Sequence, residues 1–88
     1  MLEKIKLALR IKSSVTDDDI KDLILAAKTD LSISGVKKIE DDNPLIIQAV
    51  KLYCKTFYAV ENKDMERYQK AYDALKISLA LCGDYNVG

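Results

Sequence analysis

The sequence predicts an all-α protein, a small bundle of about four helices formed by one domain that covers residues 1–88. Apolar residues recur at steps of three and four, the spacing of one helix face, in four successive segments. The single proline and two of the three glycines fall at predicted helix ends and not inside them. A hydrophobic fraction of 49% and a charged fraction of 32% are typical of a folded domain with a polar surface.

The first predicted helix covers about residues 2–11, and Leu2, Ile5 and Leu9 lie on its apolar face. The pair Ser13-Ser14 interrupts it. The next helix therefore has to begin a few residues further along.

We interpret Thr16 as the N-cap of the second helix, with Asp19 three residues later in a pattern close to a capping box. This helix runs to about Ser34, and Gly35 stands where a C′ glycine belongs. Its apolar stripe consists of Ile20, Leu23, Ile24, Ala27 and Leu31. A short loop, residues 36–42, follows.

The pair Asn43-Pro44 predicts an N-cap followed by proline at the first position of the third helix, which ends near residues 61–62. Residues 45–60 are apolar on nearly every side of this helix. The exceptions form one polar stripe: Gln48, Lys51 and Lys55. A helix of this kind must be covered by neighbours. Because a chain of 88 residues offers few neighbours, we expect another chain to supply some of them.

The fourth predicted helix covers about residues 64–82, and Gly83 closes it as a second C′ glycine. Its connection to the third helix is short, so the two should be antiparallel neighbours. Their aromatic residues could form a base-stacking surface, but the absence of net charge favours an aromatic core whose tyrosine hydroxyls reach its rim. These residues are Tyr53, Phe57, Tyr68 and Tyr72.

Composition argues against several classes of function. The 14 basic and 14 acidic side chains balance, which gives no general attraction for nucleic acid or for anionic membranes. No apolar run has the length of a membrane span, and residues 1–6 lack the apolar core of a signal peptide, so we expect a cytoplasmic protein with no membrane partner. Cys54 and Cys82 should then be reduced and buried as small hydrophobic residues.

No catalytic or cofactor constellation is recognisable. The chain has no histidine, no paired cysteines at metal-ligand spacing, and no nucleophile with a base, so we expect no enzyme, no cofactor and no metal. The acidic runs at residues 17–22 and 40–42 are explained by helix capping and solvation. A helix-turn-helix around residues 13–16 is disfavoured because the second helix would present aspartates to phosphate.

The distribution of charge along the chain suggests assembly. The first helix is basic and the start of the second is acidic, and such patches on different faces allow a head-to-tail contact between copies that can close a ring. We predict that Lys4, Lys6 and Arg10 face Asp18, Asp19 and Asp22 of a neighbouring copy. Simple solvation of both faces explains the same pattern, and both interpretations stay open at this point.

The order of residues resembles that of the small head–tail connector proteins of tailed bacteriophages, which are also called DNA-packaging proteins. Four stretches carry the resemblance: residues 2–11 (LEKIKLALRI), 18–24 (DDIKDLI), 43–50 (NPLIIQAV), and 72–79 (YDALKISL) with Gly83-Asp84-Tyr85 after it. They span almost the whole chain, although each is short. The family pattern leads us to expect a glycine just after the aromatic residues near position 58, and this chain has Ala59 there.

The resemblance implies a structural protein of the virion, made in the cytoplasm of a host bacterium. Such a protein forms a ring of its own copies beneath the portal protein, helps to retain packaged DNA, and provides a platform for a tail or head-completion protein. DNA would only pass through its channel. We further predict that the chain end, through Asp84, Tyr85 and Asn86, docks onto the portal.

A small bacterial adaptor or regulatory module, binding one protein partner through the third and fourth helices, is the alternative. Neighbouring genes for a terminase, a portal and a capsid protein would favour the connector.

Overall fold

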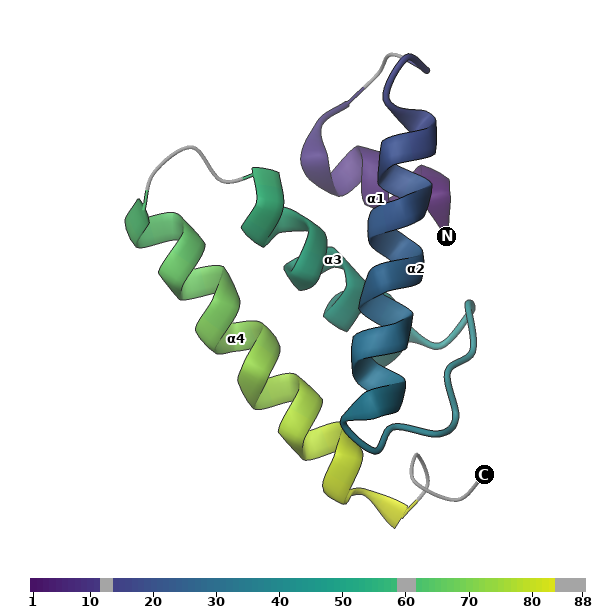
Figure 1. Ribbon diagram of the computed structural model, residues 1–88, viewed down its shortest axis with the longest axis vertical. Coiled ribbons are helices and arrows are strands. Elements are labelled where there is room, and N and C mark those ends of the chain that lie inside the picture. The colour runs from purple at the N-terminus through teal and green to yellow at the C-terminus, as the bar shows by residue number, and fades with distance from the viewer. Residues whose placement is uncertain (12–13, 59–61, 84–88) are drawn as a thin grey trace.

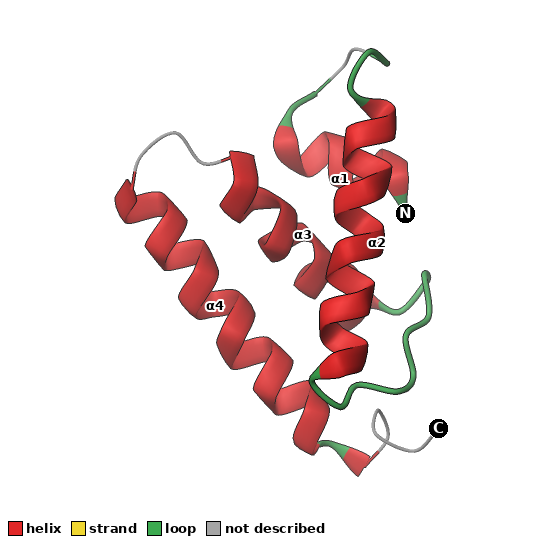
Figure 2. Ribbon diagram, viewed as in Figure 1, coloured by secondary structure: helices red, strands yellow, loops and turns green. Residues whose placement is uncertain are grey.

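The computed structural model of the protein describes residues 1–11, 14–58 and 62–83. Within these ranges the chain forms helices joined by loops, with no strand (Figure 2). The helices are α1 (Leu2–Leu9), α2 (Asp17–Ile33), α3 (Pro44–Tyr58) and α4 (Asn62–Leu81). The prediction of a small all-α bundle of about four helices is confirmed.

Helix α3 occupies the centre of the bundle and packs against α1, α2 and α4 (Figure 1). Five of its side chains are buried by these helices: Ile46, Ile47, Ala49, Val50 and Cys54. The burial of these five residues is thus accounted for inside one chain. Leu45, Phe57 and Tyr58 of α3 stay exposed, so the expectation that a second chain covers part of this helix remains a prediction for them.

Helix α2 ends as its sequence predicts. Gly35 has φ +107°, a left-handed conformation in which a side chain is strained. The Gly35 N–H bonds to the Ser32 carbonyl at 3.1 Å, and the Val36 N–H bonds to the Leu31 carbonyl at 2.9 Å. This is a Schellman motif, and the buried Val36 supplies its apolar contact.

Helix α1 ends two residues before the predicted end. Arg10 takes the left-handed conformation (φ 59°, ψ 37°), and the Ile11 N–H bonds back to the Lys6 carbonyl at 2.9 Å. In a continued helix, Ile11 would project about 120° away from the fully buried Ile5 around the axis. The left-handed turn instead lets Ile11 pack against the core. The packing of the partly buried Ile11 against the core therefore outweighs the cost of a non-glycine residue at positive φ.

The predicted capping box at the start of α2 does not form. Thr16 lies at the N-cap position, but its ψ of 10° is not the extended backbone of a capping residue, and its side chain makes no cap hydrogen bond. Its hydroxyl oxygen is buried without a hydrogen-bond partner. Asp17, Asp18 and Asp19 still lie in the first turn, where the helix dipole favours negative charge.

The predicted glycine cap of α4 is also wrong. Gly83 does not share the positive φ of Gly35. The last turn tightens instead, because the Cys82 N–H bonds to the carbonyls of both Ser78 and Leu79, at 3.1 and 3.2 Å. Cys82 is half-buried and not fully buried as predicted, whereas the prediction holds for Cys54.

The end of the loop that leads into α3 is held by two contacts. Lys28 of α2 forms an ion pair with Asp41, and the hydrogen bond from Lys28 lowers the pKa of the Asp41 carboxyl. Asn43 caps α3 as predicted, since its side-chain oxygen accepts the N–H of Leu45 at 2.9 Å. Pro44 then occupies the first helical position.

Helices α3 and α4 pack side by side, as the short connection between them predicted. The described part of α3 ends at Tyr58, and the junction near Ala59 and the predicted end at Glu61 lie outside the described residues. Helix α4 begins at Asn62, two residues before the predicted start.

Candidate interaction surfaces

The basic residues of α1 do not form one continuous patch. Lys6 is only 8% exposed, and its ammonium lies 2.8 Å from a carboxylate oxygen of Asp17 in the same chain. This pair joins the first turn of α2 to α1. Lys6 is therefore occupied within its own chain, whereas Lys4 and Arg10 are exposed. The predicted contact with a neighbouring copy stays a prediction for these two.

The acidic residues at the start of α2 separate in the same way. Asp17 turns toward α1 and Lys6. Asp18, Asp19 and Asp22 are exposed, as a contact with another protein requires. The predicted portal-docking residues, Asp84, Tyr85 and Asn86, lie outside the described residues.

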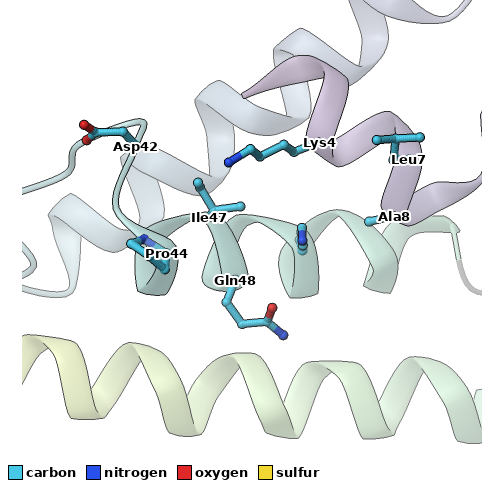
Figure 3. Close-up of a pocket in the computed structure, with 8 residues that line it drawn as sticks. Lys4, Leu7, Ala8, Asp42, Pro44, Ile47 and Gln48 are labelled. Atoms are coloured by element: carbon cyan, nitrogen blue, oxygen red, sulfur yellow. The ribbon is translucent and has the colours of Figure 1, made fainter.

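An open groove of about 680 Å³ lies between α1 and the first half of α3 (Figure 3). Its lining combines four apolar side chains with two cations, one carboxylate and one amide: Lys4, Leu7, Ala8, Asp42, Pro44, Ile47, Gln48 and Lys51. Lys4 reaches from α1 toward Ile47 of α3.

A polar cluster joins α2 to α4. The Tyr72 hydroxyl donates a hydrogen bond of 2.6 Å to Oδ2 of Asp30, and the Lys76 ammonium lies 3.2 Å from the same oxygen. Lys76 also lies over the Tyr72 ring, 5.1 Å from its centroid. Tyr72 is 42 positions from Asp30 in the sequence, and Lys76 is 46 positions from it, so no local sequence pattern could have predicted these contacts.

The electrostatics of this cluster follow from its geometry. The hydrogen bond from Tyr72 lowers the pKa of the Asp30 carboxyl, burial opposes this, and Lys76 lowers it further. Burial raises the pKa of the Tyr72 hydroxyl above its usual range, and the hydrogen bond to Asp30 adds to the effect. A tyrosine held protonated in this way acts as a fixed donor that positions α4 against α2.

The predicted aromatic core is present in part. The centroid of the Tyr53 ring lies 5.0 Å from that of Phe57 and 5.3 Å from that of Tyr72, and the Tyr53 and Tyr72 rings meet edge-on. Tyr72 is 2% exposed, so it cannot stack on a nucleic-acid base. Phe57 is 60% exposed and therefore belongs to the surface. Tyr68 lies beneath two cations, Lys55 and Arg67.

Exposed apolar side chains are the feature that sequence reasoning missed. On α2, Leu25 is 64% and Ile33 80% exposed. On α4, Ile77 is 57% and Leu81 79% exposed. Each pair lies on the helix face that points away from the buried residues of its own helix. Isolated exposed hydrophobic residues are ordinary, but an aligned set on one face suggests an interface.

Among the described residues, no group of three acidic, cysteine or histidine side chains is placed to hold a metal ion. No helix in the described ranges has the length and apolar character needed to cross a membrane. What remains is a helical scaffold with a groove, an acidic cluster and two apolar helix faces.

A sequence comparison identifies the family of this scaffold. The sequence model of a family described as phage connector protein matches residues 1–86. The chain belongs to the phage connector protein family. No curated protein and no solved structure matches it.

Membership gives this connector protein a structural role in the phage particle, in association with other head or tail proteins. The family is one of structural proteins and not of enzymes. The resemblance that the sequence suggested is thereby confirmed over nearly the full length. The match also extends through the segment near position 58, so the alanine found there does not remove the chain from the family.

Proposed function

We propose that residues 1–88 act as one connector domain, copies of which form a ring at the head–tail junction. The ring joins the portal to the tail or to a head-completion protein, and it helps to retain the packaged DNA. The family match across residues 1–86 carries this proposal. The predicted contact of Asp84, Tyr85 and Asn86 with the portal belongs to it.

Two structural features support a role in assembly. The described residues of α2 and α4 expose large apolar side chains that are aligned on one face of each helix, and an aligned set of this kind suggests an interface. The acidic start of α2 is exposed beside them, which adds a charge that a partner can recognise.

The test is to delete the gene from the phage that carries it and to examine the particles by electron microscopy. We expect heads and tails to accumulate separately, with heads that lose their DNA, and expression of the protein in trans should restore tailed particles. Normal yields of tailed, infectious particles from the deleted phage would overturn the proposal. They would favour the bacterial adaptor, whose removal leaves the particle unchanged.

A further inference from the structure

Helices α2 and α4 flank α3 and run in the same direction, from the upper to the lower end of the view in Figure 1. Each buries one side against the bundle. The buried stripe of α2 includes Ile20, Ala27 and Leu31, and that of α4 includes Tyr72 and Leu79. Both helices therefore present their opposite sides to solvent.

The exposed side of α2, which we call the α2 face, has a graded composition. In order along the helix it consists of Asp18, Asp22, Leu25, Thr29 and Ile33, all exposed. The steps between them are four, three, four and four residues, which keeps them on one side of the helix. The first turns are acidic, and the last turns are apolar.

The exposed side of α4, the α4 face, has the matching composition. In order it consists of Arg67, Lys70, Ala74, Ile77 and Leu81, all exposed. The steps are three, four, three and four residues, the spacing of a helix-packing seam. In its first turns Arg67 and Lys70 lie beside the exposed Glu66, and its last turns are apolar. Arg67 is partly occupied by an ion pair of 3.3 Å with Asp64, so Lys70 is its principal cation.

We propose that the α2 face of one copy packs in parallel against the α4 face of the next copy. In this register Asp22 lies near Lys70, Leu25 near Ala74, and Ile33 near Leu81. The inference rests on the proposed ring and names the surfaces that join its subunits.

Three arguments favour this pairing. A parallel contact between two α2 faces would bring like charges together, and so would one between two α4 faces, whereas the mixed pair is complementary. An antiparallel mixed pair would place the aspartates against Leu81 and leave them without a cation. Finally, the two helices run the same way within one copy, so a rotation axis along them brings α2 and a neighbouring α4 together in parallel, as a closing head-to-tail ring requires.

The proposal differs from the pairing of α1 with α2 that the sequence suggested. Both use the aspartates of α2, but they assign different cations to them. Charge reversal distinguishes the two: Lys70→Glu on the α4 face, and Arg10→Glu on α1 as its matched control. Both side chains are exposed, so neither variant removes a buried contact.

The first measurement is covalent. In a chain whose half-buried Cys82 is replaced by serine, Leu25→Cys and Ala74→Cys are introduced together, and the chain is oxidised with copper phenanthroline, both as purified protein and in phage particles that carry it. We expect a ladder of disulfide-linked multimers on a non-reducing gel. Each single substitution should stop at the wild-type pattern, because a head-to-tail contact does not place a residue against its own copy. No ladder in either sample overturns the proposal.

The second measurement is the native mass of the purified protein by light scattering, at low and moderate salt. If the protein assembles only in phage particles, the disulfide ladder in particles is the readout instead. Lys70→Glu should raise the concentration for half-assembly at least tenfold, and Asp22→Lys in the same chain should restore it. Assembly that is lost with Arg10→Glu and kept with Lys70→Glu overturns the α2–α4 contact but leaves the ring intact. A ladder in solution from a protein absent from the phage particle would instead support the contact and refute the proposed function.

Discussion

Removing the Tyr72 hydroxyl should measurably loosen the attachment of α4 to α2. Tyr72 is 2% exposed, and its hydroxyl donates a 2.6 Å hydrogen bond to the Asp30 carboxylate, which also forms an ion pair with Lys76. Hydrogen bonds to charged groups contribute about 1.5–3 kcal/mol. The Asp30 side chain is 37% exposed, so water replaces part of the lost bond in Tyr72→Phe. We therefore expect a loss of about 1–2 kcal/mol, toward the lower end of that range.

The assay is equilibrium unfolding in urea followed by circular dichroism, at one fixed protein concentration because assembly adds to apparent stability. A loss of this size lowers the midpoint of thermal unfolding by roughly 5–15 °C in a domain of this length. The variant Asp30→Asn and the double variant complete a thermodynamic cycle. The coupling between the two positions should account for most of the loss.

The dependence of stability on pH gives an independent check. The folded pKa of Asp30 is lowered, so its contribution is present above the unfolded pKa of about 3.9 and is lost as pH falls through the folded value. Tyr72→Phe removes the largest cause of that shift and should flatten this acid limb. At high pH the unfolded tyrosine ionises above about 10 while the folded one does not, so the wild type should lose stability that the variant keeps.

One result would refute this reasoning. Suppose that Tyr72→Phe changes the free energy of unfolding by less than about 0.3 kcal/mol and leaves its dependence on pH unchanged at both the acid and the alkaline end. In that case the hydrogen bond to Asp30 would not stabilise the contact between α2 and α4. The packing of the ring against Tyr53 would then be the whole contribution of this residue.

Four further predictions concern stability and assembly. Asn43→Ala should cost about 1 kcal/mol of unfolding free energy by removing the α3 cap, while Asn43→Asp should be nearly neutral. Lys6→Met alone should cost about 1–3 kcal/mol because Asp17 loses its partner, and a second change, Asp17→Leu, should recover most of it; chemical denaturation measures both. Arg10→Gly should stabilise the fold by up to about 1 kcal/mol because its φ is 59°, whereas Arg10→Ala should not. Deleting residues 84–88 should abolish binding to the purified portal protein without lowering the melting temperature; retained binding would contradict the docking prediction.

The helices themselves were predictable because their signals are local. Asn43 and Pro44 start α3, and Gly35 ends α2, since each satisfies a backbone requirement within a few residues of itself. The failures occurred where tertiary contacts override a local preference. Arg10 adopts a left-handed backbone because Ile11 then contacts the core, and no sequence signal within α1 predicts that contact.

The candidate surfaces were harder to predict for the same reason. A basic run and an acidic run are visible in the sequence, but only the fold shows that Lys6 forms an ion pair with Asp17 of its own chain. The Asp30 cluster joins residues more than 40 positions apart, so it has no sequence signature. The sequence thus identified the charged residues at these helix ends, but it did not show which of them the fold leaves exposed.

The surplus of apolar residues was recognised in the sequence but was assigned to one helix only. The sequence placed the excess on residues 45–60, because that segment is apolar on most sides. The structure buries five residues of that segment among the other helices but leaves Leu45, Phe57 and Tyr58 exposed, and it also exposes large apolar side chains on α2 and α4. A small domain that covers one central helix must use one side of each outer helix, so any further apolar residue on those helices has no partner within the chain. For a protein of a family that works in assemblies, the outer sides of the covering helices are therefore the place to expect contacts between copies.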